Sequence, residues 1–205
     1  MKRIFQAILL LAILFPINAS ALIEIRGSGG LTFAEPVGLN SRLTSSSISS
    51  IFAIGRWAAD GIIRFPGTPL GIGMRYDWQG IKVGSPGTGS GNEFEVSAVR
   101  TAALLSYRFI EKTGYLGLIG TYGLTHKPVV RLKESSVVSD YDSGKSFSSS
   151  IGFDGGVNAG SAMFGGEVGY QNYVINEISG PVSGQATFDM TFSGFYGMIH
   201  FGLRL

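Results

Sequence analysis

The sequence contains no cysteine, which excludes a disulfide scaffold, a thiol nucleophile, a cysteine-ligated zinc site and an iron–sulfur cluster. Charged residues make up only 15% of the 205 residues, well below the usual share of about 25%, while 44% are hydrophobic. A chain so poor in charge and so rich in apolar residues is not intrinsically disordered. The formal net charge of +2, with no basic stripe, also argues against nucleic acid as a partner.

Long apolar runs are also missing after residue 21, where no segment approaches the roughly 18 consecutive apolar residues of a transmembrane helix. Glycine is abundant instead, with 31 residues, about twice its usual ~7% share. A chain of 205 residues most simply forms one domain. The composition therefore predicts a single, glycine-rich, β-rich domain.

Residues 1–21 have the pattern of a secretory signal peptide. Lys2 and Arg3 precede an apolar stretch over 4–17, and Ala19 and Ala21 supply the small residues of a cleavage site after Ala21. The alternative, an uncleaved membrane anchor, needs about 20 apolar residues, and this stretch is shorter. Loss of Lys2 and Arg3 leaves 14 of the 16 bases against 14 acids, so the predicted mature domain, 22–205, is neutral.

The mature chain alternates between apolar and polar residues with a period of two, which is typical of β-strands with two different faces. The clearest segment, 70–79, places Met74 and Tyr76 on one face and Arg75 and Asp77 on the other. The predicted strands span 23–33, 47–57, 70–79, 99–109, 115–126, 147–157, 164–174 and 195–205. The second is the weakest, because Arg56 shares its face with apolar residues.

The predicted connections differ at the two ends of these strands. Two are short, 110–114 and 158–161, and 58–69 lies at the same end. Four longer polar loops, 34–46, 80–97, 127–146 and 175–191, lie at the other end. Short turns opposite long loops are the layout of a bacterial outer-membrane barrel. The predicted fold is therefore all-β, an eight-stranded antiparallel up-and-down transmembrane β-barrel.

In lipid a sheet must close on itself to satisfy its backbone, so the polar face of each strand turns inward. Eight strands enclose a lumen that side chains can just fill. Aromatic residues near strand ends predict two interfacial girdles. We expect Trp57, Phe109, Tyr115, Phe164 and Phe201 toward the periplasm, and Phe33, Tyr76, Trp78, Tyr122 and Phe147 toward the cell exterior.

Charged residues on the inward faces are the candidate site. They are Glu24, Arg26, Arg56, Arg75, Asp77, Arg100, Arg108, Asp154, Glu167 and Arg204. An isolated buried charge is costly, so we expect these side chains to pair or to contact trapped water. The hypothesis is a salt-bridge network that plugs the lumen, and the alternative is a gated, narrow ion path.

The signal peptide, the strand–loop rhythm and the terminal strand 195–205 resemble the small eight-stranded outer-membrane proteins, such as OmpX, OmpW and the membrane domain of OmpA. The resemblance implies residence in the outer membrane of a Gram-negative bacterium, with outer-membrane lipid and lipopolysaccharide as neighbours. It implies assembly by the barrel-assembly machinery through the C-terminal strand. It also implies a non-enzymatic role in envelope integrity or surface interaction, with no cofactor or metal, while the likeness to OmpW would imply a narrow channel for small or apolar solutes.

Other functions remain open. The motif Gly55-Arg56-Trp57 matches the G-x-W of lipocalins, a soluble barrel, although it falls in the second strand and the chain has no terminal helix pattern. Outer-membrane barrels of this size also include lipid A deacylases and palmitoyltransferases, which use a histidine beside a serine and an acid. His126 and His200 are the histidines available, and cross-strand partners decide whether either could act so.

The loops contain two weak motifs. Residues 84–91 have the spacing of a phosphate loop but lack its lysine, and 140–144 faintly resembles a calcium loop without the required Gly and Glu. Both are expected to be solvated loops. The charged third loop, 127–146, could extend the barrel as a hairpin. We hypothesise that the long loops contact a surface ligand, a host molecule or lipopolysaccharide.

Overall fold

The computed structural model describes residues 22–34, 40, 50–84, 93–111, 113–134, 137–141, 144–179 and 188–205. The predicted signal peptide, with Ala19 and Ala21, lies outside the described residues, as do most of the first loop and of the motif at 84–91. Of the motif at 140–144, residues 142 and 143 also lie outside them.

Among the described residues, no helix is long and apolar enough to cross a membrane.

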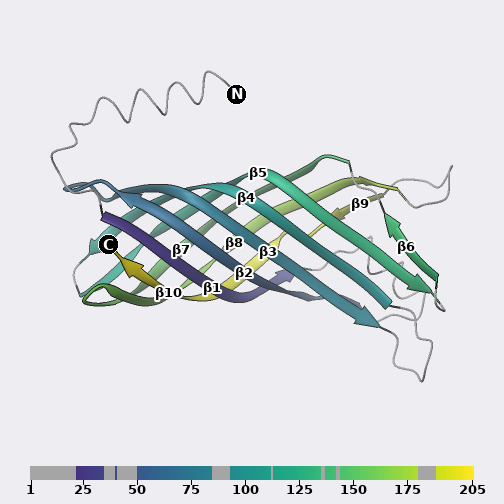
Figure 1. Ribbon diagram of the computed structural model, residues 1–205, viewed down its shortest axis with the longest axis horizontal. Helices are drawn as coiled ribbons and strands as arrows, with labels where there is room; N and C mark the ends of the chain where they lie inside the picture. Colours follow the sequence, from purple (N-terminus) through teal and green to yellow (C-terminus); the bar gives the residue numbers. More distant parts are fainter. Residues whose placement is uncertain are drawn as a thin grey trace, which may run out of the picture.

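The described chain forms a closed antiparallel β-barrel. Its strands are β1 (Leu22–Ala34), β2 (Ala53–Arg64), β3 (Leu70–Gly84), β4 (Glu93–Glu111), β5 (Gly114–Glu134), β6 (Val137–Tyr141), β7 (Ser146–Ala159), β8 (Ala162–Ile178), β9 (Phe188–Thr191) and β10 (Gly194–Arg204). Each long strand pairs with the next along the chain, and β10 pairs with both β8 and β1, which closes the barrel (Figure 1). This confirms the predicted all-β, eight-stranded, up-and-down barrel.

The two short strands lengthen the barrel at one end. β6 pairs with the last residues of β5, and β9 pairs with the last residues of β8 (Figure 1). The third loop therefore does extend the barrel as a hairpin. We call this end, where β3, β5 and β8 finish, the loop end, and the opposite end, which holds Leu22 and Arg204, the turn end.

The predicted second strand was placed too early in the chain. β2 begins at Ala53 and continues to Arg64, through residues assigned to a connection by the sequence analysis. The connection to β3 is only the turn 65–69, in which Gly67 takes a left-handed φ of 71° and the Thr68 amide donates to the Phe65 carbonyl. The end that was expected to have short turns therefore has three of them.

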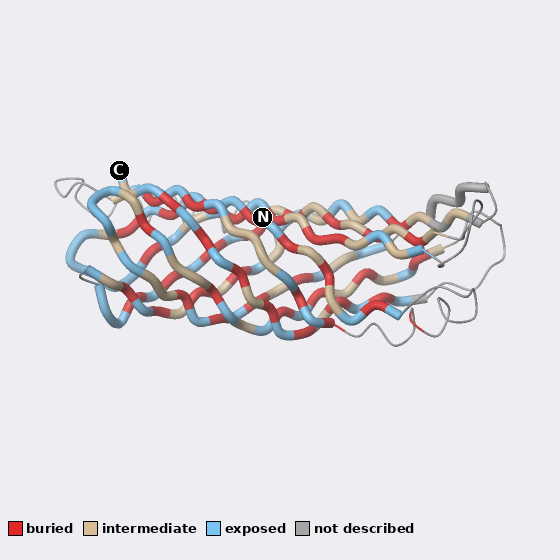
Figure 2. Tube along the Cα trace, turned by 90° about the horizontal axis from the view of Figure 1, so that it is seen from below, coloured by how far each residue is buried: buried red, intermediate tan, exposed pale blue. Residues whose placement is uncertain are grey.

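Buried and exposed residues alternate along each strand (Figure 2). The outward face carries large apolar side chains around the barrel, among them Ile25, Met74, Leu105, Phe153 and Ile199. The inward face carries the charged residues. A soluble barrel has the opposite arrangement, because its charged residues stay in contact with water on the outside and its apolar residues fill the core.

The aromatic residues form part of the expected girdles, with two corrections. Tyr122 packs edge-on against Phe147, with ring centroids 5.7 Å apart, and both face outward. Tyr115, expected outside, is buried in the lumen. Trp57, expected at the turn end, pairs in register with Trp78 and stacks on it at 6.3 Å, so the two rings share one level.

A β-bulge in β5 reverses which residues point inward. The register with β4 shifts between the pairs Thr101–Thr125 and Ala102–Gly123, so Leu124 is the extra residue. Both Leu124 and Thr125 face outward. Because of this extra residue, His126 and Val130 turn inward in the second half of the strand.

Candidate functional site: the charged lumen and its apolar cap

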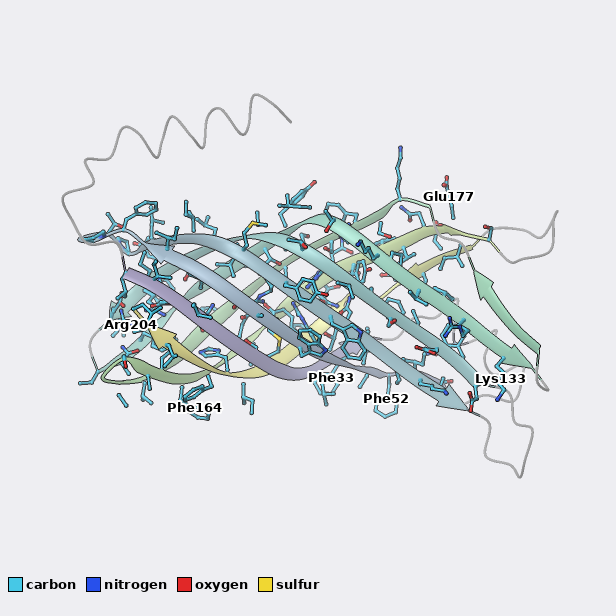
Figure 3. All side chains as sticks on the ribbon, viewed as in Figure 1. Phe33, Phe52, Lys133, Phe164, Glu177 and Arg204 are labelled. Atoms are coloured by element: carbon cyan, nitrogen blue, oxygen red, sulfur yellow. The ribbon has the colours of Figure 1, made fainter. Side chains whose placement is uncertain are left out.

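The charged residues of the lumen form three linked clusters. The first lies at the turn end, where Glu24 lies 2.8 Å from Nε of Arg64 in an ion pair and accepts hydrogen bonds from both terminal nitrogens of Arg108 at 2.7 and 2.9 Å. Glu111 contacts Arg108 at 2.8 Å and also pairs with Arg204, which Figure 3 shows at this end of the barrel. The pairs join β1, β2, β4 and β10 across the mouth.

The middle cluster is the most completely paired. Arg75 donates to both oxygens of Asp60, at 2.7 and 2.9 Å, and to both oxygens of Glu167, at 2.9 and 2.6 Å. Arg26 bridges Asp60 at 3.1 Å and Asp154 at 2.9 Å. Two bidentate arginine contacts on one guanidinium are among the strongest arrangements for charged groups. This cluster ties β1, β2 and β3 to β7 and β8 through the centre of the lumen.

The third cluster lies toward the loop end. Asp77 accepts from Arg56 at 2.6 Å and from Arg100 at 2.7 Å. The Arg56 guanidinium lies over the ring of Tyr196, 4.4 Å from its centroid, and the Tyr196 hydroxyl donates to Glu167 at 2.6 Å, which links this cluster to the middle one. Gln171 then donates to Gln79 at 2.9 Å and completes the polar section.

All ten predicted charged residues lie within this arrangement. Nine are buried, and Arg204 is partly exposed at the turn end. Sequence reasoning missed Asp60 and Arg64, because β2 was ended too early, and it also missed Glu111. The signal for the first two was readable, since Asp60, Ile62 and Arg64 alternate with Ala59, Gly61 and Ile63.

The two histidines lie inside the lumen at different levels. The hydroxyl of Tyr115 hydrogen-bonds to Nε2 of His200, whose Nε2 also lies 3.6 Å from Asp154. Nε2 of His126 lies 2.8 Å from Oγ of Ser148, and its ring stacks on Tyr173 at 5.7 Å.

These contacts bring a serine to a histidine, as the enzymatic alternative requires. Among the described residues, however, a carboxylate lies near His200 but none forms an ion pair with His126, and Ser148 is fully buried beneath the apolar residues described next. A side chain at position 123 would overlap Ser148 and His126, so Gly123 allows the two to approach. The pair therefore packs the lumen, with a Ser–His hydrogen bond but no visible acid.

An apolar cluster fills the lumen at the loop end, and we call it the apolar cap. It consists of Ala34, Ile51, Ile54, Phe94, Val96, Ala98, Val130, Tyr173, Ile175, Ile178, Met190 and Phe192. At its boundary with the polar section, the space between Ile54, Gln79 and Phe192 has no room for a water molecule. The cap was not predicted from the sequence, because most of its residues lie in segments that were expected to be polar loops.

Strands β3, β4 and β5 reverse their polarity where the cap begins. Below it, Arg100 and Asp77 point inward, while Leu105 and Tyr76 point outward. Above it, the inward residues Phe94, Val96 and Val130 are apolar, and most of the outward residues are charged. A strand whose outer face becomes charged has left the hydrocarbon region of a bilayer, because charge on the lipid-facing surface is costly there.

The outward charged residues of this region form a cross-strand ladder. It contains Lys82, Glu93, Glu95, Arg131 and Lys133, which line a hollow of about 230 Å³ on the outer surface. Lys82 lies 2.9 Å from Glu93, and Arg131 lies 3.7 Å from Glu95. The hydrogen bond from Lys82, together with the charge of Lys133, holds the pKa of the Glu93 carboxyl below its usual value.

Comparison with known proteins gives similarity at the level of architecture. No family model matches the chain, and no curated protein matches it. Among solved structures, it is similar to Neisserial surface protein A, with a TM-score of 0.44 and 11% identity over 91% of this chain and 97% of that one. It is also similar to the outer membrane protein OprG from Pseudomonas aeruginosa, with a TM-score of 0.43 and 15% identity over 90% of this chain and 96% of that one.

Proposed function

We propose that this chain is a non-enzymatic integral outer-membrane β-barrel whose lumen is closed, and that it supports the envelope or binds surface ligands through its loop end. The observation that carries the proposal is the filling of the lumen. The clusters around Arg108, Arg75 and Asp77 occupy it from the turn end, and the apolar cap occupies it from the loop end.

Residence in an outer membrane is supported by the distribution of polarity. Among the described residues, the eight long strands close on one another, so none of them leaves an edge to be satisfied by lipid, and the outward face carries an apolar belt. Short turns lie at one end and the longer connections at the other, which is the usual orientation of periplasmic and extracellular sides. Assembly through the terminal strand fits the pairing of β10 with both β8 and β1.

The narrow channel is the competing function, and the residues that fill the lumen argue against it. A conducting path needs polar, hydrated walls along its full length. The cap provides instead a section lined by Ile, Val, Phe and Met, at a point with no space for water. Ions would have to cross both the paired charges and this apolar section.

Cysteine labelling tests the closure directly, because the natural chain has no cysteine to interfere. Ser150 lies in the lumen, where it hydrogen-bonds to Thr121 at 2.6 Å, and Lys145 is exposed immediately before β7. In the folded barrel a charged, membrane-impermeant thiol reagent should label Lys145→Cys and not Ser150→Cys. Both should react after unfolding.

Rapid labelling of Ser150→Cys in the folded barrel would refute a closed lumen. Comparable protection of Lys145→Cys would show instead that the reagent does not reach the loop end. The unfolded samples control for the intrinsic reactivity of each thiol.

A further inference from the structure

The charge ladder stands at the level where an outer leaflet presents its headgroups. Trp78 and Lys127 face outward in one cross-strand row with Val99, at the upper edge of the apolar belt. Lys82, Glu95 and Arg131 form the row four residues further on. Four residues of a tilted strand rise by roughly 10 Å, whereas the headgroup layer is about 5–8 Å deep on each side of the hydrocarbon core, so the ladder stands at the outer edge of the headgroups.

Positive charge predominates on this side of the barrel. The ladder holds three cations and two carboxylates, and Lys127 below it adds a fourth cation. On the far side of the loop end, the exposed acidic residues Glu177 and Asp189 on β8 and β9 outnumber the exposed cation Lys145. Figure 3 shows Lys133 far toward the loop end, beyond the level of Phe33, so β5 carries this charge above the shorter strands.

The cations of the ladder are paired, but their side chains stay in contact with solvent. The contact of Arg131 with Glu95 is long, at 3.7 Å, and the side chains of Lys82 and Arg131 are 60% and 42% exposed. Exposed pairs of this kind contribute little to stability. Basic residues beside a membrane surface, by contrast, attract anionic headgroups.

From these observations we propose that the charge ladder docks the phosphorylated headgroup of an outer-leaflet lipid in the hollow bounded by Lys82, Arg131 and Lys133. Phosphate oxygens would accept from these three side chains, while the acyl chains lie against the apolar belt below. Glu93 and Glu95 hold the cations in place when no lipid is bound and compete with the phosphate. This proposal rests on the outer-membrane residence proposed above, but it does not depend on closure of the lumen.

The test uses the full mature chain folded in nanodiscs of zwitterionic lipid. The probe is bis-phosphorylated lipid A, compared with the same lipid after enzymatic removal of its phosphates, and bound lipid is counted by native mass spectrometry. The variant Lys82→Gln/Arg131→Gln/Lys133→Gln should bind the phosphorylated lipid at least about tenfold more weakly than the natural chain. The control Lys145→Gln removes an exposed cation outside the ladder and should bind normally.

A second variant should change lipid binding in the opposite direction. Glu93→Gln/Glu95→Gln removes the competing carboxylates and should strengthen binding of the phosphorylated lipid. Weaker binding by this variant would mean that the carboxylates hold the lipid through a bridging cation, which overturns direct docking. Equal binding of dephosphorylated lipid, or a triple variant within twofold of the natural chain, would each overturn the proposal too.

Folding of each variant is checked by heat-modifiable migration in gels. A folded barrel that does not bind the phosphorylated lipid refutes the docking site without affecting the proposed membrane residence. A chain that does not enter nanodiscs at all refutes the membrane residence.

Discussion

Arg75 is the residue whose loss should disturb the lumen most. Its guanidinium makes four hydrogen bonds to Asp60 and Glu167, and all three side chains are buried. Substitution by methionine keeps most of the volume and removes the charge. Two buried carboxylates then lose their main partner, and removal of one member of a buried ion pair costs about 3–5 kcal/mol.

The structure places the expected cost of Arg75→Met near the lower end of that range. Asp60 keeps its contact with Arg26 at 3.1 Å, and Glu167 keeps the hydrogen bond from Tyr196 at 2.6 Å. We therefore expect a loss of about 3 kcal/mol in the free energy of unfolding. Against a total of about 5–15 kcal/mol for a typical domain, this is easily measured.

The assay is urea unfolding of the barrel in phospholipid vesicles, followed by tryptophan fluorescence. A double-mutant cycle with Glu167→Gln should give a coupling energy of about 1–3 kcal/mol, because Glu167→Gln removes the carboxylate that Arg75→Met leaves without its arginine partner. Met74→Leu, at the neighbouring outward position, is the matched control and should change stability by less than about 0.5 kcal/mol. A cost below about 1 kcal/mol for Arg75→Met, with no coupling to Glu167, would refute the buried network.

Three further outcomes follow from the barrel. Gly73→Ala should cost several kcal/mol in urea unfolding, because its Cβ would overlap a backbone carbonyl of β2, whereas Gly27→Ala, which points into open space, should be neutral; equal effects would contradict the packing. Val168→Arg places a charge on the apolar belt and should cost about 2–4 kcal/mol, unless the belt is not in lipid. In a carboxyl NMR titration, Glu93 should have a pKa below the usual value, so its ion pair holds at neutral pH and is lost as the pH falls through that lowered pKa. Lys82→Gln should raise the pKa of Glu93. An unchanged pKa in this variant would contradict the ion pair with Lys82.

The alternation of apolar and polar residues was enough to predict the inward-facing side chains wherever a strand has no bulge and no change of polarity. Arg75 and Asp77 sit between outward-facing Met74, Tyr76 and Trp78, so their side chains had to share the other face. The sequence could not show which of these charges meet across the barrel. The pairing of Arg75 with Glu167 joins residues that are 92 positions apart, through the closure of the sheet.

Local features of β2 and β5 explain why some inward-facing residues were not predicted. In β2 the alternation of Asp60 and Arg64 is readable but is weakened by the adjacent pair Ile62 and Ile63, because Ile62 packs inside against Leu104 and Ile119. In β5 the bulge at Leu124 shifts the inward phase, and nothing in the residue types marks it. Without the bulge, simple alternation from Leu118 and Tyr122 would turn His126 outward.

The apolar cap was missed because the same alternation carries two meanings. In Phe94, Val96 and Ala98 the apolar residues point inward, whereas in Leu105 and Tyr107 they point outward. The sequence shows the period of two in both halves of β4. Only the position of the lipid boundary decides which face is the apolar one, and that boundary became visible with the register of the strands.

Electrical measurement in planar bilayers tests the central claim most directly. The mature barrel, inserted from detergent into a bilayer, should give no ion current above the lipid baseline at either polarity, because the ion-pair clusters and the apolar cap fill the lumen. Insertion is verified in the same preparation by protease protection of the strands. A stable unit current from the inserted, folded barrel would contradict the closed lumen and favour the narrow channel.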